Sequence, residues 1–287
     1  MGDTVLASCF SEDEADEHCR LRRRLLSVDS ELPPPAVGFP AAADGFLEAG
    51  ADRLLHNLRE YGLAVVHLDE SLTHDQFVAL GALLGEAIPE TDDAVQPYVE
   101  DGIVLNLVAD AGRTQDVSLQ PFATGPLSLH SEGSGRSAAD QPRYIVLMCE
   151  EPGSGESAAT VLVPMAAVAD RLSAEDAVLL AATRYEGRPG VPTVARREDG
   201  RTVYSFRDFQ RDPLHWVCDA PEAHPDTVNR AIRRLLAGMY APRQAYGVPW
   251  TRGLLVVIDN TWFFHGRTAG AVGPVGRPRH LKRLRIR

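Results

Sequence analysis

Two separated stretches of the chain are decisive: Pro126-Leu-Ser-Leu-His-Ser-Glu132 and Val257-Ile-Asp-Asn-Thr-Trp-Phe-Phe-His-Gly-Arg-Thr268. In the first, His130 and Glu132 are two residues apart, and residues at this spacing on a strand point to the same face of a sheet. Two neutral imidazoles and one carboxylate compose the facial triad that holds non-haem Fe(II) with coordination positions left open. The sequence therefore predicts a metal site formed by His130, Glu132 and His265.

The flanking residues support this prediction, whereas a His-X-Glu tripeptide alone arises easily by chance among nine histidines and forty acidic residues. Residues 253–260 form a continuous apolar run that predicts a buried strand, so His265 follows a strand and can line a pocket. The C-terminal residues 276–287 are rich in arginine, which is typical of a solvated tail or a patch for nucleic acid. Apolar residues alternate with these charges, however, and favour a final strand that could direct an arginine toward the metal site.

The chain resembles the clavaminate synthase-like branch of the Fe(II)/2-oxoglutarate-dependent dioxygenases, within the taurine dioxygenase (TauD/TfdA) superfamily. The resemblance extends from about residue 50 to the C-terminus. It rests on the His-X-Glu form of the first motif, on the segments 142–149 and 279–283, and on Asp259-Asn-Thr-Trp-Phe-Phe-His-Gly-Arg-Thr268. It implies an enzyme of the 2-oxoglutarate-dependent non-haem iron dioxygenase type that requires Fe(II), the cosubstrate 2-oxoglutarate and O2.

The resemblance also implies residues for the cosubstrate. Arg279 lies fourteen residues after His265, where the family places the arginine that binds a 2-oxoglutarate carboxylate. A planar guanidinium can hold a carboxylate by two parallel hydrogen bonds, which a lysine cannot do. Thr160 matches the family threonine that hydrogen-bonds the cosubstrate. The glycine-rich stretch 269–276 departs from the family pattern, so Arg277 and Arg283 remain alternatives to Arg279.

The implied fold is mixed α/β with a mainly β core, a double-stranded β-helix (jelly-roll, cupin-like) with flanking helices. Periodicity by itself predicts only a mixed α/β domain, with helices at 46–61, 71–85, 164–180 and 223–241 and a strand at 63–68. We expect one catalytic domain over residues 46–287, preceded by an N-terminal extension, residues 1–45, that packs on it.

The implied reaction is hydroxylation of an unactivated C–H bond, at Cβ or Cγ of an amino acid or an amino-acid-derived intermediate, with release of succinate and CO2. Such reactions are typical of natural-product pathways, including antibiotic biosynthesis, and the substrate can be free or attached to a carrier protein. The same fold can also catalyse desaturation, cyclisation or epimerisation. The alternative outside the enzymes is a non-catalytic protein that keeps the barrel and binds a metabolite without turnover.

Four polar residues are candidates for contact with the substrate. Asp208 and Asp212 lie where related enzymes carry acidic residues that hold a basic side chain, although exposed loop charges are the more common explanation. Asn106 and Gln120 precede the metal strand and could hydrogen-bond the polar groups of an amino acid, although ordinary sheet and loop roles are more common.

The composition restricts partners and location. The chain has 29 basic and 40 acidic residues, a formal charge of −11, which disfavours nucleic acid as a partner. The four cysteines form no CxxC pair, and no long apolar run or leader pattern occurs. We therefore expect a cytoplasmic protein that does not associate with membranes.

Overall fold

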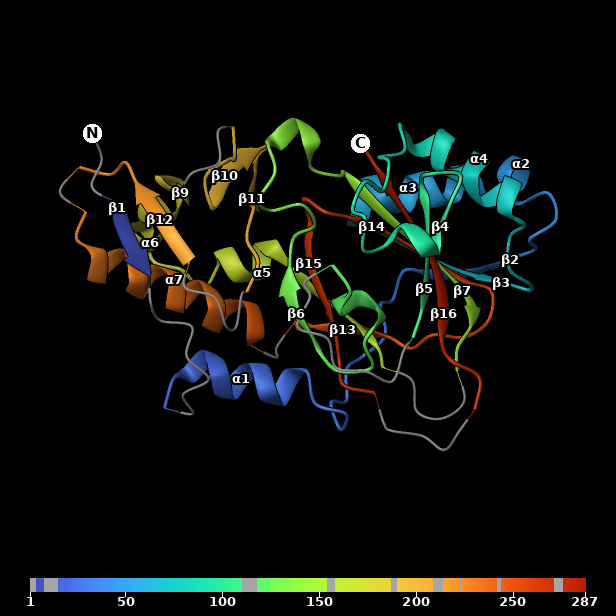
Figure 1. Cartoon of the computed structure of the whole chain (residues 1–287), viewed down its shortest axis with the longest axis horizontal. Coiled ribbons are helices and arrows are strands. Elements are labelled where there is room, and N and C mark those ends of the chain that lie inside the picture. Colours follow the sequence, from blue (N-terminus) through green and yellow to red (C-terminus); the bar gives the residue numbers. More distant parts are fainter. Residues whose placement is uncertain are drawn as a thin grey trace.

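Two β-sheets form the centre of the molecule (Figure 1). The computed structural model describes residues 4–7, 15–109, 118–153, 158–186, 190–208, 214–221, 223–241, 244–270 and 276–287. The larger sheet has seven strands in the order β2-β3-β14-β7-β16-β5-β4. These are β2 (Gly38–Ala41), β3 (Leu63–Leu68), β14 (Leu254–Asp259), β7 (Tyr144–Glu151), β16 (His280–Ile286), β5 (Val104–Val108) and β4 (Val99–Glu100).

The smaller sheet has four strands in the order β13-β8-β15-β6. They are β13 (Tyr246–Val248), β8 (Thr160–Pro164), β15 (Phe263–Arg267) and β6 (Leu127–His130), and all three pairings are antiparallel. The chain changes sheets at residues 260–262, because β14 belongs to the larger sheet and β15 to the smaller one. His265 is therefore inside a strand of its own rather than in a loop after the predicted one.

A buried apolar cluster includes side chains from both sheets. Leu147 and Val256 come from the larger sheet, and Leu162 and Phe263 come from the smaller one. Continuous apolar runs on β7 and β14 fit strands that are covered on both faces. The predicted mixed α/β class with a mainly β core is confirmed at this level.

Helices α2 (Phe46–Ala49), α3 (Ala51–Tyr61) and α4 (His74–Leu84) contribute to a second apolar cluster with strands of the larger sheet. A left-handed glycine, Gly62 at φ 65°, ends α3, and a Cβ there would lie 2.3 Å from the Trp262 ring. A capping box between Thr73 and Gln76 begins α4. The predicted helices at 46–61 and 71–85 are confirmed, the first in two pieces.

A second group of elements extends the molecule beside the smaller sheet (Figure 1). The helices are α1 (Glu17–Leu25), α5 (Met165–Ala169), α6 (Ala174–Ala181) and α7 (Pro225–Tyr240), and the strands are β1 (Thr4–Ala7), β9 (Thr183–Tyr185), β10 (Ala195–Glu198), β11 (Arg201–Tyr204) and β12 (Leu214–Cys218). The helix expected at 164–180 is two helices, because Ser173 forms a capping box with Asp176 and starts a new one. Short 3₁₀ turns occupy Gln96–Tyr98, Gln120–Phe122 and Ala138–Asp140.

The N-terminal region contributes to both parts of the fold. Helix α1 packs through Leu25 and Leu26 into the cluster that contains α7, and β2 pairs in parallel with β3 at the edge of the larger sheet. The expected boundary at residue 45 falls between β2 and α2. The division into an extension and one catalytic domain stays a prediction.

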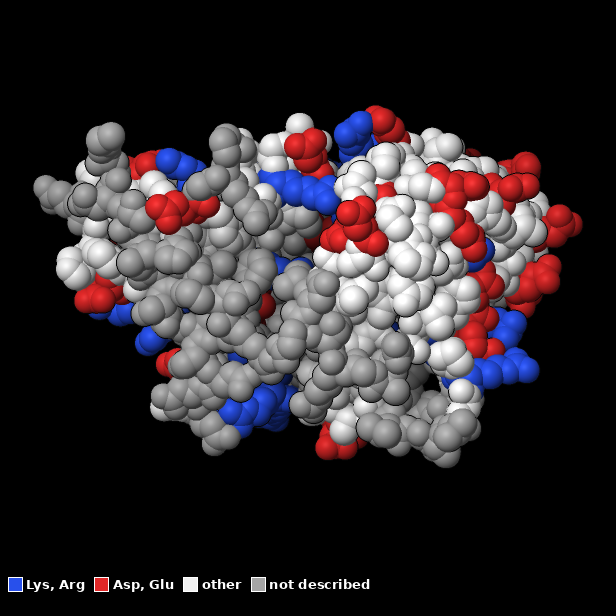
Figure 2. Space-filling model, viewed as in Figure 1, with Lys and Arg blue, Asp and Glu red and all other residues white. Residues whose placement is uncertain are grey.

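The surface agrees with the acidic composition. Figure 2 shows acidic side chains spread over the part of this face that lies over α2 to α4, with a few basic ones among them. None of the helices in the described ranges is long and apolar enough to cross a membrane. Three of the four cysteines, Cys19, Cys149 and Cys218, are buried free thiols, and Cys9 lies outside the described residues.

Candidate metal centre

Strand pairing brings the two predicted histidine ligands together. His265 on β15 is the direct antiparallel partner of His130 on β6, and the pairing shifts register just after His265. Directly opposed residues on antiparallel strands point to the same face. The two imidazole rings are 4.2 Å apart between centroids, and both residues are buried.

Glu132 reaches the histidines from a turn rather than from the strand. β6 ends at His130, so alternation along a strand does not aim the Glu132 carboxylate. Asn260, just after β14, accepts a hydrogen bond from the Glu132 N–H at 2.7 Å and donates to the carbonyls of Glu132 at 3.0 Å and Pro142 at 2.9 Å. This side chain fixes the backbone of Glu132.

The three side chains converge on one point. Oε2 of Glu132 lies 3.5 Å from Nε2 of His130 and 3.7 Å from Nε2 of His265, and the three ligand atoms all lie within 4.8 Å of one another. Atoms that share one metal ion at about 2 Å each lie roughly 3 to 4 Å apart. The three residues therefore fit a single ion.

His130 is in the form that binds metal. Burial, followed by the nearby His265, lowers the pKa of His130 to about 4, so its ring is neutral near pH 7. Nδ1 of His130 lies 2.8 Å from the Ser128 carbonyl, which leaves Nε2 free to face the site. Nδ1 of His265 is buried and has no hydrogen-bond partner among the described residues.

Glu132 is in its charged form. Burial alone favours its protonated state, but the adjacent His130 and His265 side chains and the charge of Arg283 hold the pKa of Glu132 well below its usual range. A deprotonated carboxylate beside two neutral imidazoles is the donor set of the facial triad.

A cavity of about 280 Å³ adjoins the three residues. Its wall includes five apolar residues, Leu107, Leu127, Ile145, Leu147 and Leu281, and six arginines, Arg136, Arg207, Arg267, Arg279, Arg283 and Arg285. Alternation along β16 places residues 281, 283 and 285 on this wall, and Arg279, just before the strand, also lines it. We expected the final strand to direct one arginine toward the site, and in the structure more than one arginine of this segment lines the cavity.

Two of these arginines are buried without a carboxylate partner among the described residues. Arg279 is 8% exposed, its Nε has no hydrogen-bond partner, and burial lowers its pKa. Arg267 donates to the carbonyls of Gln120, Pro121 and Gly125, and burial together with the charge of Arg279 lowers its pKa to about 9. Such a pair of positive charges favours an anion in the cavity.

The alternatives to Arg279 have other partners. Arg277 has a side chain that is 78% exposed and lies 3.5 Å from Glu151 at the surface. Arg283 is bound to Glu90 at 2.9 Å.

Thr160 lines the cavity, opposite Arg267 in the sheet, and its Oγ accepts a hydrogen bond from Nε1 of Trp250 at 3.1 Å. The threonine hydroxyl can still donate to an anion.

The four substrate candidates have different positions. Gln120 accepts a hydrogen bond from the cavity residue Arg207 at 2.8 Å, so it lies next to the site. Asn106 is paired with His280 at 2.8 Å and does not line the cavity. Asp212 lies outside the described residues.

Asp208 is not positioned to hold a basic substrate. It is 2% exposed, pairs with Arg22 at 2.7 Å and accepts a hydrogen bond from the Tyr240 hydroxyl at 2.7 Å. The prediction failed because the preceding residue, Arg207, faces the cavity, and neighbouring residues in extended chain point to opposite sides.

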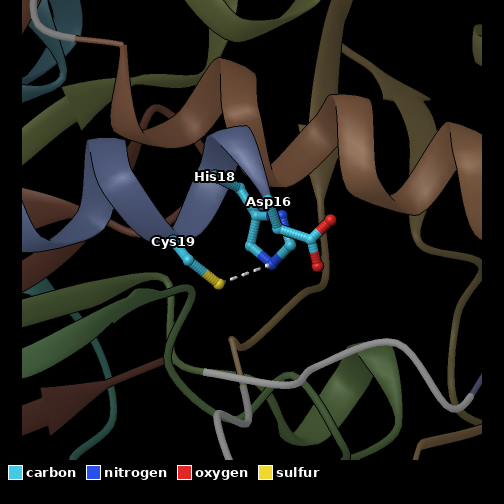
Figure 3. Close-up of side chains that lie close together, drawn as sticks. All are labelled: Asp16, His18 and Cys19. Atoms are coloured by element: carbon cyan, nitrogen blue, oxygen red, sulfur yellow. Dashed lines mark hydrogen bonds between the residues drawn. The ribbon is translucent and has the colours of Figure 1, made fainter. Parts of the chain in front are cut away.

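A second group of potential metal ligands in the described part of the chain is Asp16, His18 and Cys19, at the start of α1. Figure 3 shows the Cys19 thiol and the His18 ring directed toward each other, at 3.5 Å, with the Asp16 carboxylate beside them. The Arg22 guanidinium lies 3.9 Å from the Cys19 sulfur, and its positive charge opposes a bound cation. The same Arg22 pairs with Asp208 at 2.7 Å, so it is held beside this group.

Sequence reasoning missed Asn260, Glu90 and Arg285. Asn260 stands in the motif after β14, but its contact with Glu132 depends on a loop distant in sequence. No sequence motif around Glu90 indicates its place in the site. Arg285 could have been found from the alternation of residues along the final strand.

Comparison with known protein families assigns the class of enzyme. A family model described as "Taurine catabolism dioxygenase TauD, TfdA family" matches residues 29–285. The chain thus belongs to the TauD/TfdA family, and it is a 2-oxoglutarate-dependent non-haem iron dioxygenase. No curated protein sequence matches it closely enough to narrow this assignment.

Solved structures share the fold at low identity. Two structures of PvcB, one from Pseudomonas aeruginosa and one described as an Fe, alpha-ketoglutarate dependent oxygenase from an isonitrile synthetic pathway, are each 22% identical over 90% of each chain, with TM-scores of 0.60 and 0.58. An asparagine oxygenase in complex with Fe(II), 3-hydroxyasparagine and succinate is 17% identical over 96% of this chain and 92% of that one, at 0.61. The non-heme iron oxygenase OrfP, in complex with (3S)-hydroxy-L-arginine, is 18% identical over 85% and 81%, at 0.61.

Proposed function

We propose that this dioxygenase hydroxylates an unactivated C–H bond, at Cβ or Cγ of an amino acid or an amino-acid-derived intermediate, in natural-product biosynthesis. The observation that supports this proposal is the convergence of His130, Glu132 and His265 beside a cavity. The wall of this cavity contains two buried arginines that have no carboxylate partner among the described residues. We further propose that the two sheets are those of a double-stranded β-helix, since both contribute to one apolar cluster.

Each residue has a separate role in this proposal. His130, Glu132 and His265 hold Fe(II), because they supply two imidazole nitrogens and one carboxylate oxygen. Arg279 binds the distal carboxylate of 2-oxoglutarate and Thr160 hydrogen-bonds it, because both line the cavity and a dicarboxylate supplies the missing negative charge. Fe(II) and 2-oxoglutarate, when bound, would allow O2 to act as the oxidant, so that one oxygen atom enters the substrate as a hydroxyl group and the other enters succinate, with release of CO2.

The apolar part of the cavity wall supports oxidation of carbon. Leu107, Ile145, Leu147 and Leu281 exclude water from the space beside the metal ligands. This protects a reactive site from side reactions and leaves room for the hydrocarbon portion of a substrate.

An amino-acid-like substrate fits the charges of the wall. Arg207, hydrogen-bonded to Gln120, faces the cavity close to His130, to whose backbone it is bridged. We propose that this pair binds the carboxylate of the substrate. The solved asparagine oxygenase and OrfP, which were crystallised with hydroxylated amino acids, support this substrate class.

The test is anaerobic addition of Fe(II) and 2-oxoglutarate to the wild-type protein, His130→Ala and His67→Ala. His67 is exposed on β3, away from the site, and serves as the matched control. We expect the weak visible charge-transfer band of the iron–cosubstrate complex in the wild type and in His67→Ala, but not in His130→Ala. A wild-type protein that is loaded with iron and shows no band would contradict the proposal.

Turnover then identifies the substrate. Amino acids are screened by substrate-dependent succinate formation in air, and the product mass distinguishes the outcomes. Hydroxylation adds one oxygen, desaturation and ring closure remove two hydrogens, and epimerisation leaves the mass unchanged.

A further inference from the structure

One oxygen of Glu132 faces the histidines and the other faces two arginines. Oε2 is the oxygen near His130 and His265, at 3.5 and 3.7 Å. Oε1 lies 3.4 Å from Nη1 of Arg285 and 3.8 Å from Nη1 of Arg283. The carboxylate is therefore oriented with one oxygen toward the proposed ion and one away from it.

The same two guanidinium groups bind a second buried carboxylate, Glu90. Nη2 of Arg283 lies 2.9 Å from Oε1 of Glu90, and Nη2 of Arg285 lies 2.7 Å from Oε2. Each arginine thus uses one nitrogen for Glu90 and the other for Glu132. The four side chains carry two positive and two negative charges, all on the cavity wall.

The backbone holds both sides of this network in place. Arg283 and Arg285 are two residues apart on β16, which lies between β7 and β5 (Figure 1). The carbonyl of Arg285 accepts a hydrogen bond from the N–H of Ile88 at 2.7 Å. The N–H of Glu90 donates to Gly102 at 2.8 Å, and the carbonyl of Glu90 accepts from Gln96 at 2.7 Å.

Stability does not account for such a network. Replacing buried ion pairs by apolar residues of similar volume is often neutral or stabilising, because desolvation of the charges offsets their attraction. A position on a cavity wall beside three potential metal ligands suggests a role in arranging those ligands.

We propose that Glu90, Arg283 and Arg285 are positioning residues that hold Glu132 as a one-oxygen metal ligand, an inference that rests on the proposed function. With Oε1 bound by the guanidiniums, only Oε2 can bind the ion, so a second coordination position stays available for the cosubstrate or O2. Glu90 balances the charge of the arginines, which otherwise repel a cation and pull both oxygens of Glu132 toward themselves.

Cobalt(II) binding tests this inference independently of turnover. Co(II) affinity is measured by calorimetry, and the visible spectrum reports the coordination number. We expect Glu90→Gln to weaken Co(II) binding about 10- to 100-fold, the usual range for residues that orient metal ligands. Arg285→Lys keeps the positive charge but removes the two-nitrogen guanidinium that contacts Glu90 and Glu132 together. Oε1 of Glu132 then becomes free to bind the ion, and the Co(II) spectrum should change toward a higher coordination number.

The chain contains a matched control at the surface. Arg287, at the end of the same strand, pairs with Glu86 at 2.7 and 3.0 Å. Glu86→Gln and Arg287→Lys repeat the two substitutions there, and exposed pairs contribute little. We expect both variants to bind Co(II) with wild-type affinity and spectrum.

The outcomes separate the inference from the proposed function. A wild-type protein that fails to bind Co(II) contradicts both. If Glu90→Gln and Arg285→Lys match their surface controls, the metal site stands and the positioning role is wrong. Circular dichroism and urea midpoints verify that the variants fold. If Glu90→Gln does not fold, the Co(II) spectrum of Arg285→Lys tests the positioning role alone: a wild-type spectrum contradicts it.

Discussion

Arg279 is the residue whose proposed role is easiest to separate from those of its neighbours. It is buried in the cavity, whereas Arg277, two residues earlier, has an exposed side chain. We expect Arg279→Lys to raise the KM for 2-oxoglutarate about 10- to 100-fold, because one of two charge-assisted hydrogen bonds is lost. Arg277→Lys should leave this KM within about twofold of the wild type, since an exposed pair contributes little.

Steady-state kinetics with a saturating substrate would measure both constants. Equal KM values for the two variants would remove Arg279 from the cosubstrate site and favour Arg283. The sequence offered all three arginines; burial separates Arg279 from Arg277, and the pairing with Glu90 separates it from Arg283. Burial follows from the strand register, which spacing to His265 does not specify.

At the scale of elements, the site depends on how closely β6 approaches β15. A Cβ at Gly266 would lie 2.6 Å from the Leu127 carbonyl oxygen, so only glycine allows this approach. We expect Gly266→Ala to push the strands apart, separate His130 from His265 and weaken Co(II) binding at least about tenfold. The matched control is Gly270→Ala, whose Cβ would meet its nearest atom at 3.5 Å, an ordinary contact.

Calorimetric titration of both variants with Co(II) is the measurement. Wild-type affinity in Gly266→Ala would mean that the strands can shift without disturbing the ligands. Loss of affinity in Gly270→Ala would show that the effect is not specific to the strand contact.

The elements were predicted more successfully than their connections. Periodicity and caps located α3, α4 and α7, because these helices are amphipathic or begin at a cap. The separate strand β15 was missed, since the short turn at 260–262 carries no glycine or proline. Glu132 was expected on a strand but lies in a turn, because its position is set by Asn260, a contact between residues far apart in sequence.

At the scale of the whole molecule, the buried His130 makes the stability of the metal-free protein depend on pH. Burial lowers the pKa of His130 from its usual 6.5 to about 4. As the pH falls below about 6.5, the unfolded chain takes up this proton while the folded protein does not, so the folded state loses stability. The loss continues until the pH reaches about 4 and amounts to roughly 3 kcal/mol.

Urea denaturation of the metal-free protein between pH 7.5 and pH 5 would measure this loss, with His130→Gln as the test variant. We expect a shallower pH dependence in His130→Gln than in the wild type, and no such change in His67→Gln. Identical slopes in all three proteins would mean that His130 takes up its proton in the folded state as easily as in the unfolded chain.

The metal ligands come from distant parts of the chain: His130 and Glu132 lie near its middle, whereas His265 lies on β15 close to the C-terminus. During synthesis, a ribosome-bound chain that has not yet released β15 has two of the three ligands and lacks the strand that faces β6. We therefore expect iron to be acquired only after β15 has left the ribosome and paired with β6. Chains that have not yet released β15 would not carry a redox-active ion next to unprotected polypeptide.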